Sequence, residues 1–202
     1  WVVLAVGTFV VYSSLGLARF GYSIVLPAMQ AGLHMDNTRG GVLATANLIG
    51  YLTLSVIGGA LAAHYGPRKV IAAGLTLVGA AMVLTGLSRG FLSAVVWRTV
   101  TGLGSGASNV PVMALLSAWF AQRRRGTASG VAVAGSSIAL ISLGPVAPRV
   151  LQAYGENGWR VCWFIFGAAT LVLALVSLLL LRDRPSEMGL APLGSGADED
   201  TP

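Results

Sequence analysis

Charged side chains are scarce in this chain. Of its 202 residues, 10% are charged and 55% are hydrophobic, whereas an ordinary soluble domain carries roughly 25% charged residues. Acidic residues are scarcer still, because the chain holds seven of them and none lies within a long apolar run. The composition therefore excludes a soluble globular protein. The apolar runs also lack the carboxylate that usually carries protons inside a membrane.

Cysteine and metal-binding patterns are nearly absent as well. Cys162 is the single cysteine, which excludes an internal disulfide and a site built from several thiolates. We expect neither a metal nor a cofactor. The formal net charge of +6 would suggest nucleic acid as the partner of a soluble protein. Here the basic residues lie mainly between apolar runs, where membrane topology explains them, so we expect no nucleic acid partner.

Long apolar runs, by contrast, recur along most of the chain. A helix needs ~20 mostly apolar residues to cross a bilayer, and runs of 18 or more favour helices over a closed barrel, since every backbone polar group in hydrocarbon must be paired internally. The sequence therefore predicts an all-α membrane protein, with residues 1–181 forming a bundle of six transmembrane helices. We expect the spans at 2–29, 40–63, 70–87, 92–118, 127–150 and 159–181.

Arginine and lysine residues in the loops predict the orientation of the bundle. One side carries four of them at helix ends and the other side carries seven, and the richer side is expected to face the cytoplasm. Both termini then lie in the cytoplasm. The seven residues are Arg68, Lys69, Arg123, Arg124, Arg125, Arg182 and Arg184.

The composition changes abruptly after the last apolar run. Residues 182–202 are polar, rich in proline and glycine, and acidic at the end, which predicts a disordered cytoplasmic linker. The chain also opens on Trp1 inside an apolar run. We expect it to be one piece of a longer protein.

A short basic segment between the second and third spans carries a motif. The segment GALAAHYGPRKV at 59–70 resembles the loop signature G-x-x-x-D-R-x-G-R-R of the major facilitator superfamily of transporters. Two departures matter, because Ala63 stands where the family usually has aspartate and Pro67 replaces a basic residue. The matching positions are Gly59, Gly66, Arg68 and Lys69.

Other segments resemble the same family in the same order. WRTVTGLGSGA at 97–107 is similar to its R-x-x-x-G-x-G-x-G pattern, and WFAQRRRGTASG at 119–130 is similar to its basic loop after the fourth helix. RPSEMGLAP at 184–192 looks like the segment after the sixth helix in bacterial organic-anion members. The resemblance implies a bacterial inner-membrane protein with two six-helix halves, each built from two inverted three-helix repeats, and substrate near the midplane. Only the N-terminal half is present, so its partner is the missing C-terminal half.

Two charges lie inside the predicted spans, away from their ends: Arg19 and Arg98. If the first helix ends near Pro27, Arg19 lies ~12 Å from its outer end at 1.5 Å per residue. Counted from the start of the fourth span near Leu92, Arg98 lies ~9 Å from the same face. A charge at this depth is costly and usually functional. We predict that these guanidiniums face a cavity and bind an anionic substrate, for which their planar fork of donors is suited. Alternatively, Arg19 caps carbonyls or reaches outward, and Arg98 orders helix packing.

Weaker candidates line the same faces. Asn47, Tyr51 and Asn109 are predicted to contact substrate, although such side chains also commonly make hydrogen bonds between membrane helices. The resemblance further implies a cytoplasmic gate at Gly59, Ala63, Gly66, Arg68 and Lys69. In the family the aspartate of this loop belongs to a charge network that closes the gate. With Ala63 in its place, we predict a weaker or differently built latch.

The functional prediction is a secondary active transporter that works by alternating access on a small organic anion, such as a monocarboxylate. A multidrug efflux antiporter is the main alternative, favoured by Gly144 and Pro145. A non-transporting membrane assembly of six helices is a further one. An intramembrane hydrolase using Ser105 or Ser136 lacks a base, because both histidines lie in predicted loops, and we expect no enzyme.

Overall fold

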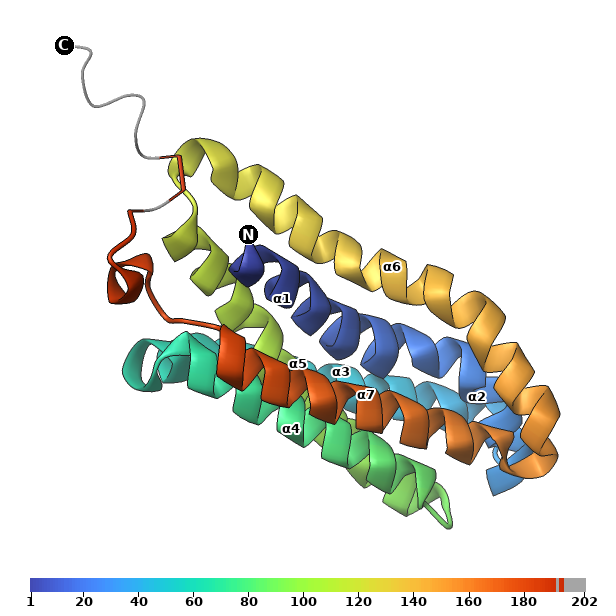
Figure 1. Cartoon of the computed structure of the whole chain (residues 1–202). Coiled ribbons are helices and arrows are strands. Elements are labelled where there is room, and N and C mark those ends of the chain that lie inside the picture. Colours follow the sequence, from blue (N-terminus) through green and yellow to red (C-terminus); the bar gives the residue numbers. More distant parts are fainter. Residues whose placement is uncertain (192, 195–202) are drawn as a thin grey trace.

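Six helical rods run up and down the molecule in a single antiparallel bundle (Figure 1). The computed structural model describes residues 1–191, 193 and 194, and within these the regular structure is helical apart from one isolated bridge between Phe120 and Leu193. The predicted all-α class and six-span order are confirmed. The first rod joins α1 (Val2–Val11), the π-helix η1 (Tyr12–Phe20) and α2 (Gly21–Leu33), and the others are α3 (Asn37–Tyr65), α4 (Pro67–Gly86), α5 (Phe91–Trp119), α6 (Gln122–Tyr154) and α7 (Gly158–Leu180).

The first rod is longer than its sequence suggested. It continues through Pro27 to Leu33 and ends where His34 adopts the left-handed conformation, at φ 50°. The expectation that the helix stops near Pro27 is therefore wrong. A proline removes one backbone donor, and membrane helices tolerate this loss because the freed carbonyl is satisfied locally. The depth reckoned for Arg19 from that residue was consequently too shallow.

The turns between helices follow the local sequence. Asp36 caps α3, because its Oδ1 accepts a hydrogen bond of 2.8 Å from the backbone N–H of Arg39. Gly66 has a φ of 88°, a value that favours glycine, and Pro67 follows at the first position of α4, where its missing N–H costs nothing. The predicted corner between α3 and α4 is thus a one-residue turn.

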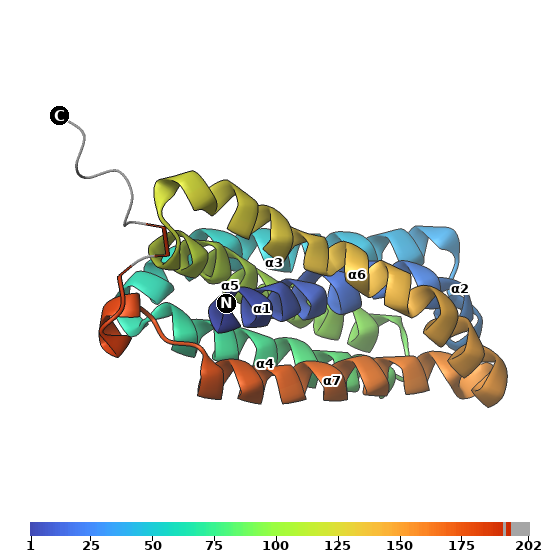
Figure 2. The same ribbon diagram turned by 45° about the horizontal axis from the view of Figure 1, so that its top comes forward.

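Small residues let α5 lie close to both α3 and α4. A Cβ on Gly102 would overlap the backbone carbonyl of Asn47 in α3, and one on Gly74 of α4 would overlap the Ser108 hydroxyl of α5. Close backbone approach through small residues is the usual contact between membrane helices. In the turned view of Figure 2, α5 passes through the interior of the bundle, with α4 and α7 along one edge and α6 along the opposite edge.

Four helical stretches of the described chain are long and apolar enough to cross a membrane: Val2–Leu33, Asn37–Tyr65, Pro67–Gly86 and Gln122–Leu180. The last comprises α6 and α7, which run in opposite directions around the short η2 turn (Gly155–Asn157). The remaining helix, α5, is less apolar because polar residues such as Arg98, Thr101 and Asn109 line it. The chain is a multi-pass membrane protein.

The segment after α7 packs on the end of the bundle. It forms the short helix η3 (Pro185–Met188), and Leu193 exchanges backbone hydrogen bonds with Trp119 and Ala121, its N–H donating to the first and its carbonyl accepting from the second. These contacts were not expected of a disordered linker at 182–202. The remainder of that predicted linker, 192 and 195–202, lies outside the described residues.

Candidate functional site

A pocket of ≈ 310 Å³ opens between the first rod, α3 and α5, where the sequence places its two intramembrane arginines. Three of the five predicted substrate contacts line it: Arg19, Asn47 and Arg98. The structure thus brings together residues that are far apart in the chain. The other lining residues are Phe20, Tyr22, Ser23, Ala44, Thr45 and Leu48.

Arg98 is the more deeply placed of the two arginines. Only 1% of its surface is exposed, and its Nη1 donates a hydrogen bond of 2.7 Å to the carbonyl oxygen of Ala18. The guanidinium carbon lies 4.5 Å from the ring centre of Tyr22 and 5.1 Å from that of Trp163. Such contacts hold a cation within about 6 Å of an aromatic face. Arg98 therefore ties α5 to the first rod and to α7.

One donor of Arg98 is nevertheless unused. Its buried Nε–H has no hydrogen-bond partner in the structure, and a buried donor without a partner costs roughly 1–3 kcal/mol. No acidic residue lies within the helices that cross the bundle interior. The acids closest to Arg19 and Arg98 along the chain are Asp36 and Glu156, which lie at helix ends. The positive charge at the pocket wall is thus balanced by carbonyl and aromatic groups rather than by a carboxylate.

Arg19 lies in a more open environment. It is partly exposed, occupies the last turn of η1, and its guanidinium carbon lies 5.6 Å from the ring centre of Tyr51 in α3. A π-helix has one extra residue per turn compared with an α-helix and often marks a functional position in a membrane or soluble protein. Here the last two residues of the π-helix, Arg19 and Phe20, lie at the pocket wall.

The remaining predicted contacts serve helix packing as well. Asn47 Nδ2 donates a 3.0 Å hydrogen bond to the carbonyl of Arg98, and Asn109 Nδ2 donates one of 3.0 Å to the Tyr51 hydroxyl. Both bonds join α3 to α5, as the packing interpretation anticipated. Asn109 Oδ1 is buried and has no partner. Tyr51 and Asn109 lie beside the pocket and are not among the residues that line it.

The corner between α3 and α4, to which the predicted gate residues belong, lies at the end of the bundle that also holds the α5–α6 turn and the end of α7 (Figure 1). Gly59, Ala63 and Gly66 line a pocket of ≈ 520 Å³ together with Asp183 and Glu187. Arg68 and Lys69 follow in the first turn of α4. Lys69 lines a different, apolar pocket. Among the predicted glycines, Gly66 makes the turn, whereas a Cβ on Gly59 would meet one side-chain atom at 3.9 Å.

Asp183 supplies an acid to this corner that the sequence motif lacks. Its Oδ1 accepts a hydrogen bond of 2.6 Å from the backbone N–H of Arg68, so it caps the start of α4, where Gly66 has no side chain to do so. Arg68 in turn donates from Nε to the carbonyl of Leu178, at 2.6 Å. Sequence reasoning missed this cap because the two residues are 115 positions apart. An acid directly after the last apolar run was the only available signal.

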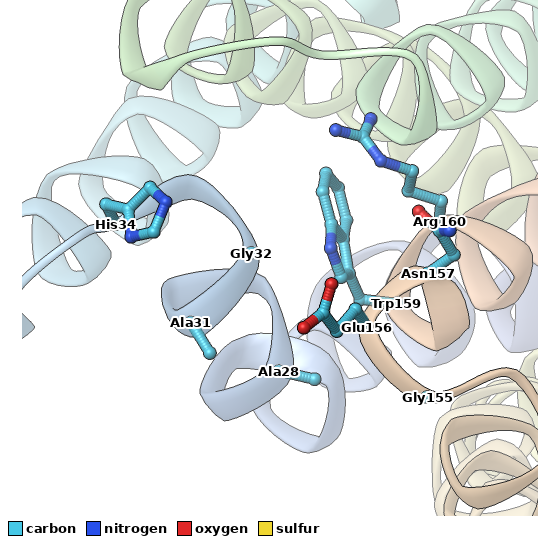
Figure 3. Close-up of a pocket in the computed structure, with 9 residues that line it drawn as sticks. All are labelled: Ala28, Ala31, Gly32, His34, Gly155, Glu156, Asn157, Trp159 and Arg160. Carbon is cyan, nitrogen blue, oxygen red and sulfur yellow. The ribbon is translucent and has the colours of Figure 1, made fainter.

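The opposite end of the bundle carries another pocket, of ≈ 370 Å³, between α2 and the turn that starts α7 (Figure 3). Arg160 holds this end together: its Nη1 donates 2.7 Å hydrogen bonds to the carbonyls of Gly86 and Ser88, and its guanidinium carbon lies 4.2 Å from the Trp159 ring centre. In Figure 3, His34 lies across the opening from Trp159. These contacts fasten the α4–α5 loop, which gives Arg160 a structural role.

Within residues 1–191, 193 and 194, no group of three or more His, Cys, Asp or Glu side chains could hold a metal ion.

The sequence did not predict the two aromatic side chains that contact Arg98. Tyr22 lies on the first rod and Trp163 on α7, and their distance from Arg98 along the chain gave no sign of either contact.

The described chain is thus an all-helical bundle with a positively charged pocket between its first, second and fourth rods. A family model described as the Major Facilitator Superfamily matches residues 8–197, and the chain belongs to this family. Its members are transporters rather than enzymes, which removes the intramembrane hydrolase from consideration. The resemblance stated from the loop motifs is confirmed.

Curated relatives are of the same kind. The chain is 27% identical to the probable sulfoacetate transporter SauU of Cupriavidus necator, over 84% of this chain and 39% of that protein. It is 26% identical to a probable hexose phosphate transport protein of Chlamydia pneumoniae, over 92% and 40%, and 23% identical to the hexuronate transporter of Bacillus subtilis, over 85% and 40%. The chain thus spans about two fifths of the length of these relatives.

The fold is also that of solved structures. The chain superposes with a TM-score of 0.78 on a bacterial homologue of the human lysosomal transporter Spinster in an inward-facing, occupied conformation. Sequence identity is 18%, and the match covers 91% of this chain and 44% of the other. The likeness extends over nearly all of this chain and confirms the predicted half-bundle of two three-helix repeats.

Proposed function

We propose that this chain is the N-terminal half of a secondary active transporter of small organic anions, which works by alternating access around the pocket between the first rod, α3 and α5. The observation that carries the proposal is the pair of guanidiniums at the pocket wall, with no acid in the helices around them. A carboxylate, sulfonate or phosphate entering such a pocket finds donors suited to planar, charge-assisted hydrogen bonds. The missing half would supply the other wall.

The relatives' names support an anionic cargo. Sulfoacetate, hexose phosphate and hexuronate all carry at least one negative charge at neutral pH, and the proteins named for them match this chain. Within the pocket the roles differ. Arg19 would contact the anion directly, Asn47 and Arg98 would shape the wall, and Tyr51 with Asn109 would hold the face of α3 on which Arg19 rests.

A multidrug efflux antiporter of the same superfamily is the alternative. It is favoured by Gly144 and Pro145 in α6, and disfavoured by the charge of the pocket, because two uncompensated arginines repel the cationic compounds that many such exporters carry. An organic-anion panel and a cationic-dye panel, offered to the same cells, separate the two functions.

The orientation and the gate complete the proposal. The bundle lies in a bacterial inner membrane with its basic loops and both termini in the cytoplasm, as the positive-inside rule requires. The corner at Gly59, Ala63, Gly66, Arg68 and Lys69 acts as the cytoplasmic latch, and Asp183 supplies the acid that Ala63 does not. Ala63→Asp should then strengthen the latch and favour the outward-open state in a cysteine-accessibility assay. An unchanged accessibility pattern would count against this role.

The test is uptake by the intact protein in cells or proteoliposomes, measured against a panel of monocarboxylates, sulfonates and sugar acids. Charge reversal by Arg19→Glu or Arg98→Glu should abolish uptake of every anion that the unmodified protein carries. Arg89→Glu, at an exposed loop position, is the matched control and should leave uptake unchanged. Intact uptake after reversal at both Arg19 and Arg98 would refute anion binding in this pocket.

A further inference from the structure

A groove lies between α3 and α4 on the outer surface of the bundle, with α5 as its floor. Its volume is ≈ 410 Å³. It exists because α3 and α4 each pack closely on α5 through glycine contacts, while they touch one another far less. The residues of its walls are apolar or small, except for Tyr65 and Lys69 at one end. The lining residues are Leu54, Leu61, Tyr65, Lys69, Val70, Ala73, Gly74, Leu77 and Ala107.

The groove is separate from the proposed substrate pocket. Ala107 forms its floor, and Arg98 lies nine residues earlier on the same helix. Nine residues correspond to two and a half turns of an α-helix, so the two side chains point to opposite sides of α5. The groove therefore faces away from the arginine pocket, and its occupant would not be the transported solute.

The two polar residues stand together at the corner between α3 and α4. Tyr65 is 59% exposed, and Lys69 is exposed one turn into α4. Lys69 is the only lysine in the chain. The neighbouring Arg68 is directed to another partner, because its Nε donates to the carbonyl of Leu178 in α7. Lys69 is thus the basic side chain that lines this end of the groove.

The length of the groove matches one leaflet of a bilayer. From Lys69 to Leu77 along α4 is ~12 Å, and from Tyr65 to Leu54 along α3 is ~16 Å, at 1.5 Å per residue. Half of a ~30 Å hydrocarbon core is ~15 Å. The apolar part of the groove therefore runs from the membrane surface at the basic end to about the midplane.

We propose that this groove is a binding site for an anionic phospholipid of the leaflet on the side of the basic loops. One acyl chain lies between α3 and α4 on Ala107, and the phosphate contacts the Lys69 ammonium and the Tyr65 hydroxyl. Basic residues at the end of an apolar groove between helices are the chemistry that recognises anionic headgroups. The site depends on membrane insertion and is independent of which solute the protein transports.

The headgroup contact is tested on the intact protein by native mass spectrometry. Phosphatidylglycerol and phosphatidylcholine with the same acyl chains are offered at equal concentration, and retained lipid is counted. The unmodified protein should retain phosphatidylglycerol with an affinity about fivefold higher, the effect expected of one basic residue near the surface. Lys69→Gln should abolish this preference, Lys69→Arg should keep it, and Arg89→Gln, in the loop after α4 at the opposite end of the bundle, should leave it unchanged.

The acyl contact is tested by filling the groove. Ala73→Phe should lower the retention of both lipids, whereas Ala60→Phe, at an exposed α3 position outside the groove, should not. A measurement without any variant complements both: phosphatidylglycerol should slow acetylation of the Lys69 amine relative to phosphatidylcholine, as followed by mass spectrometry of the peptide that carries Lys69. The proposal is overturned if Lys69 reacts equally in both lipids, or if Lys69→Gln keeps the preference for phosphatidylglycerol.

Discussion

Arg19 and Arg98 are the same residue type, line the same pocket and belong to the leading helices of the two three-helix units, yet their surroundings differ. Arg98 sits on a regular α-helix and is enclosed by Tyr22, Trp163 and the Ala18 carbonyl. Arg19 ends a π-helical stretch, is partly exposed and rests on one ring, that of Tyr51. A buried cation with fixed partners organises the bundle, and an open one is available to a ligand.

The largest expected effect on stability comes from replacing Arg98, the enclosed arginine. Arg98→Gln removes a charge-assisted hydrogen bond and two contacts with aromatic rings, and it should lower the unfolding free energy by about 3 kcal/mol. Arg19→Gln should leave it nearly unchanged. Thermal unfolding of the purified intact protein, followed by tryptophan fluorescence, measures both. Equal stability of the two variants would show that Arg98 does not hold the helices together.

A somewhat smaller loss of stability is expected from a change at Gly102, where α5 packs on α3 close to Arg98. Gly102 lies one turn further along α5, and a Cβ there would overlap the Asn47 carbonyl. Gly102→Ala should push α3 away and cost about 1–3 kcal/mol of stability, as overpacking usually does. Gly41→Ala is the control, because nothing lies within 4 Å of a Cβ at that position. If the Gly102→Ala protein is as stable as the Gly41→Ala protein, α3 moves away from α5 at no cost in stability.

The smallest effect is expected far from both arginines. Asp183→Ala removes the cap from the start of α4 and should cost about 1 kcal/mol, the usual value for such a cap. Asp183→Asn should recover part of it, since an amide oxygen still accepts the Arg68 N–H. Thermal unfolding of the purified intact protein measures both variants. An Asp183→Ala protein as stable as the unmodified one would show that the cap does not hold the start of α4.

Much of this architecture could be predicted from the sequence because hydrophobic length and loop charge are local properties. Apolar runs gave the six rods, and the signature at 59–70 located the corner that Gly66 and Pro67 form. The exact ends of the helices were harder to predict, because the continuation of the first rod through Pro27 depends on the helices packed around it.

The sequence singled out three of the residues that line the pocket, but it did not predict how their surroundings differ. Intramembrane position singled out Arg19 and Arg98, but sequence alone treats the two alike. Their difference arises from Trp163 and Tyr51, which tertiary packing brings from other helices. The Asp183 cap was hidden for the same reason, because it joins the two ends of a long stretch of chain.

The most direct test of this account measures transport and folding together for Arg19→Gln in the intact protein. Uptake of the preferred organic anion is recorded over a range of concentrations, beside thermal unfolding of the same sample. The account predicts wild-type unfolding with a KM raised about tenfold or more, the cost of losing a hydrogen bond to a charged group. A wild-type KM, with Arg19→Gln properly folded, would contradict it.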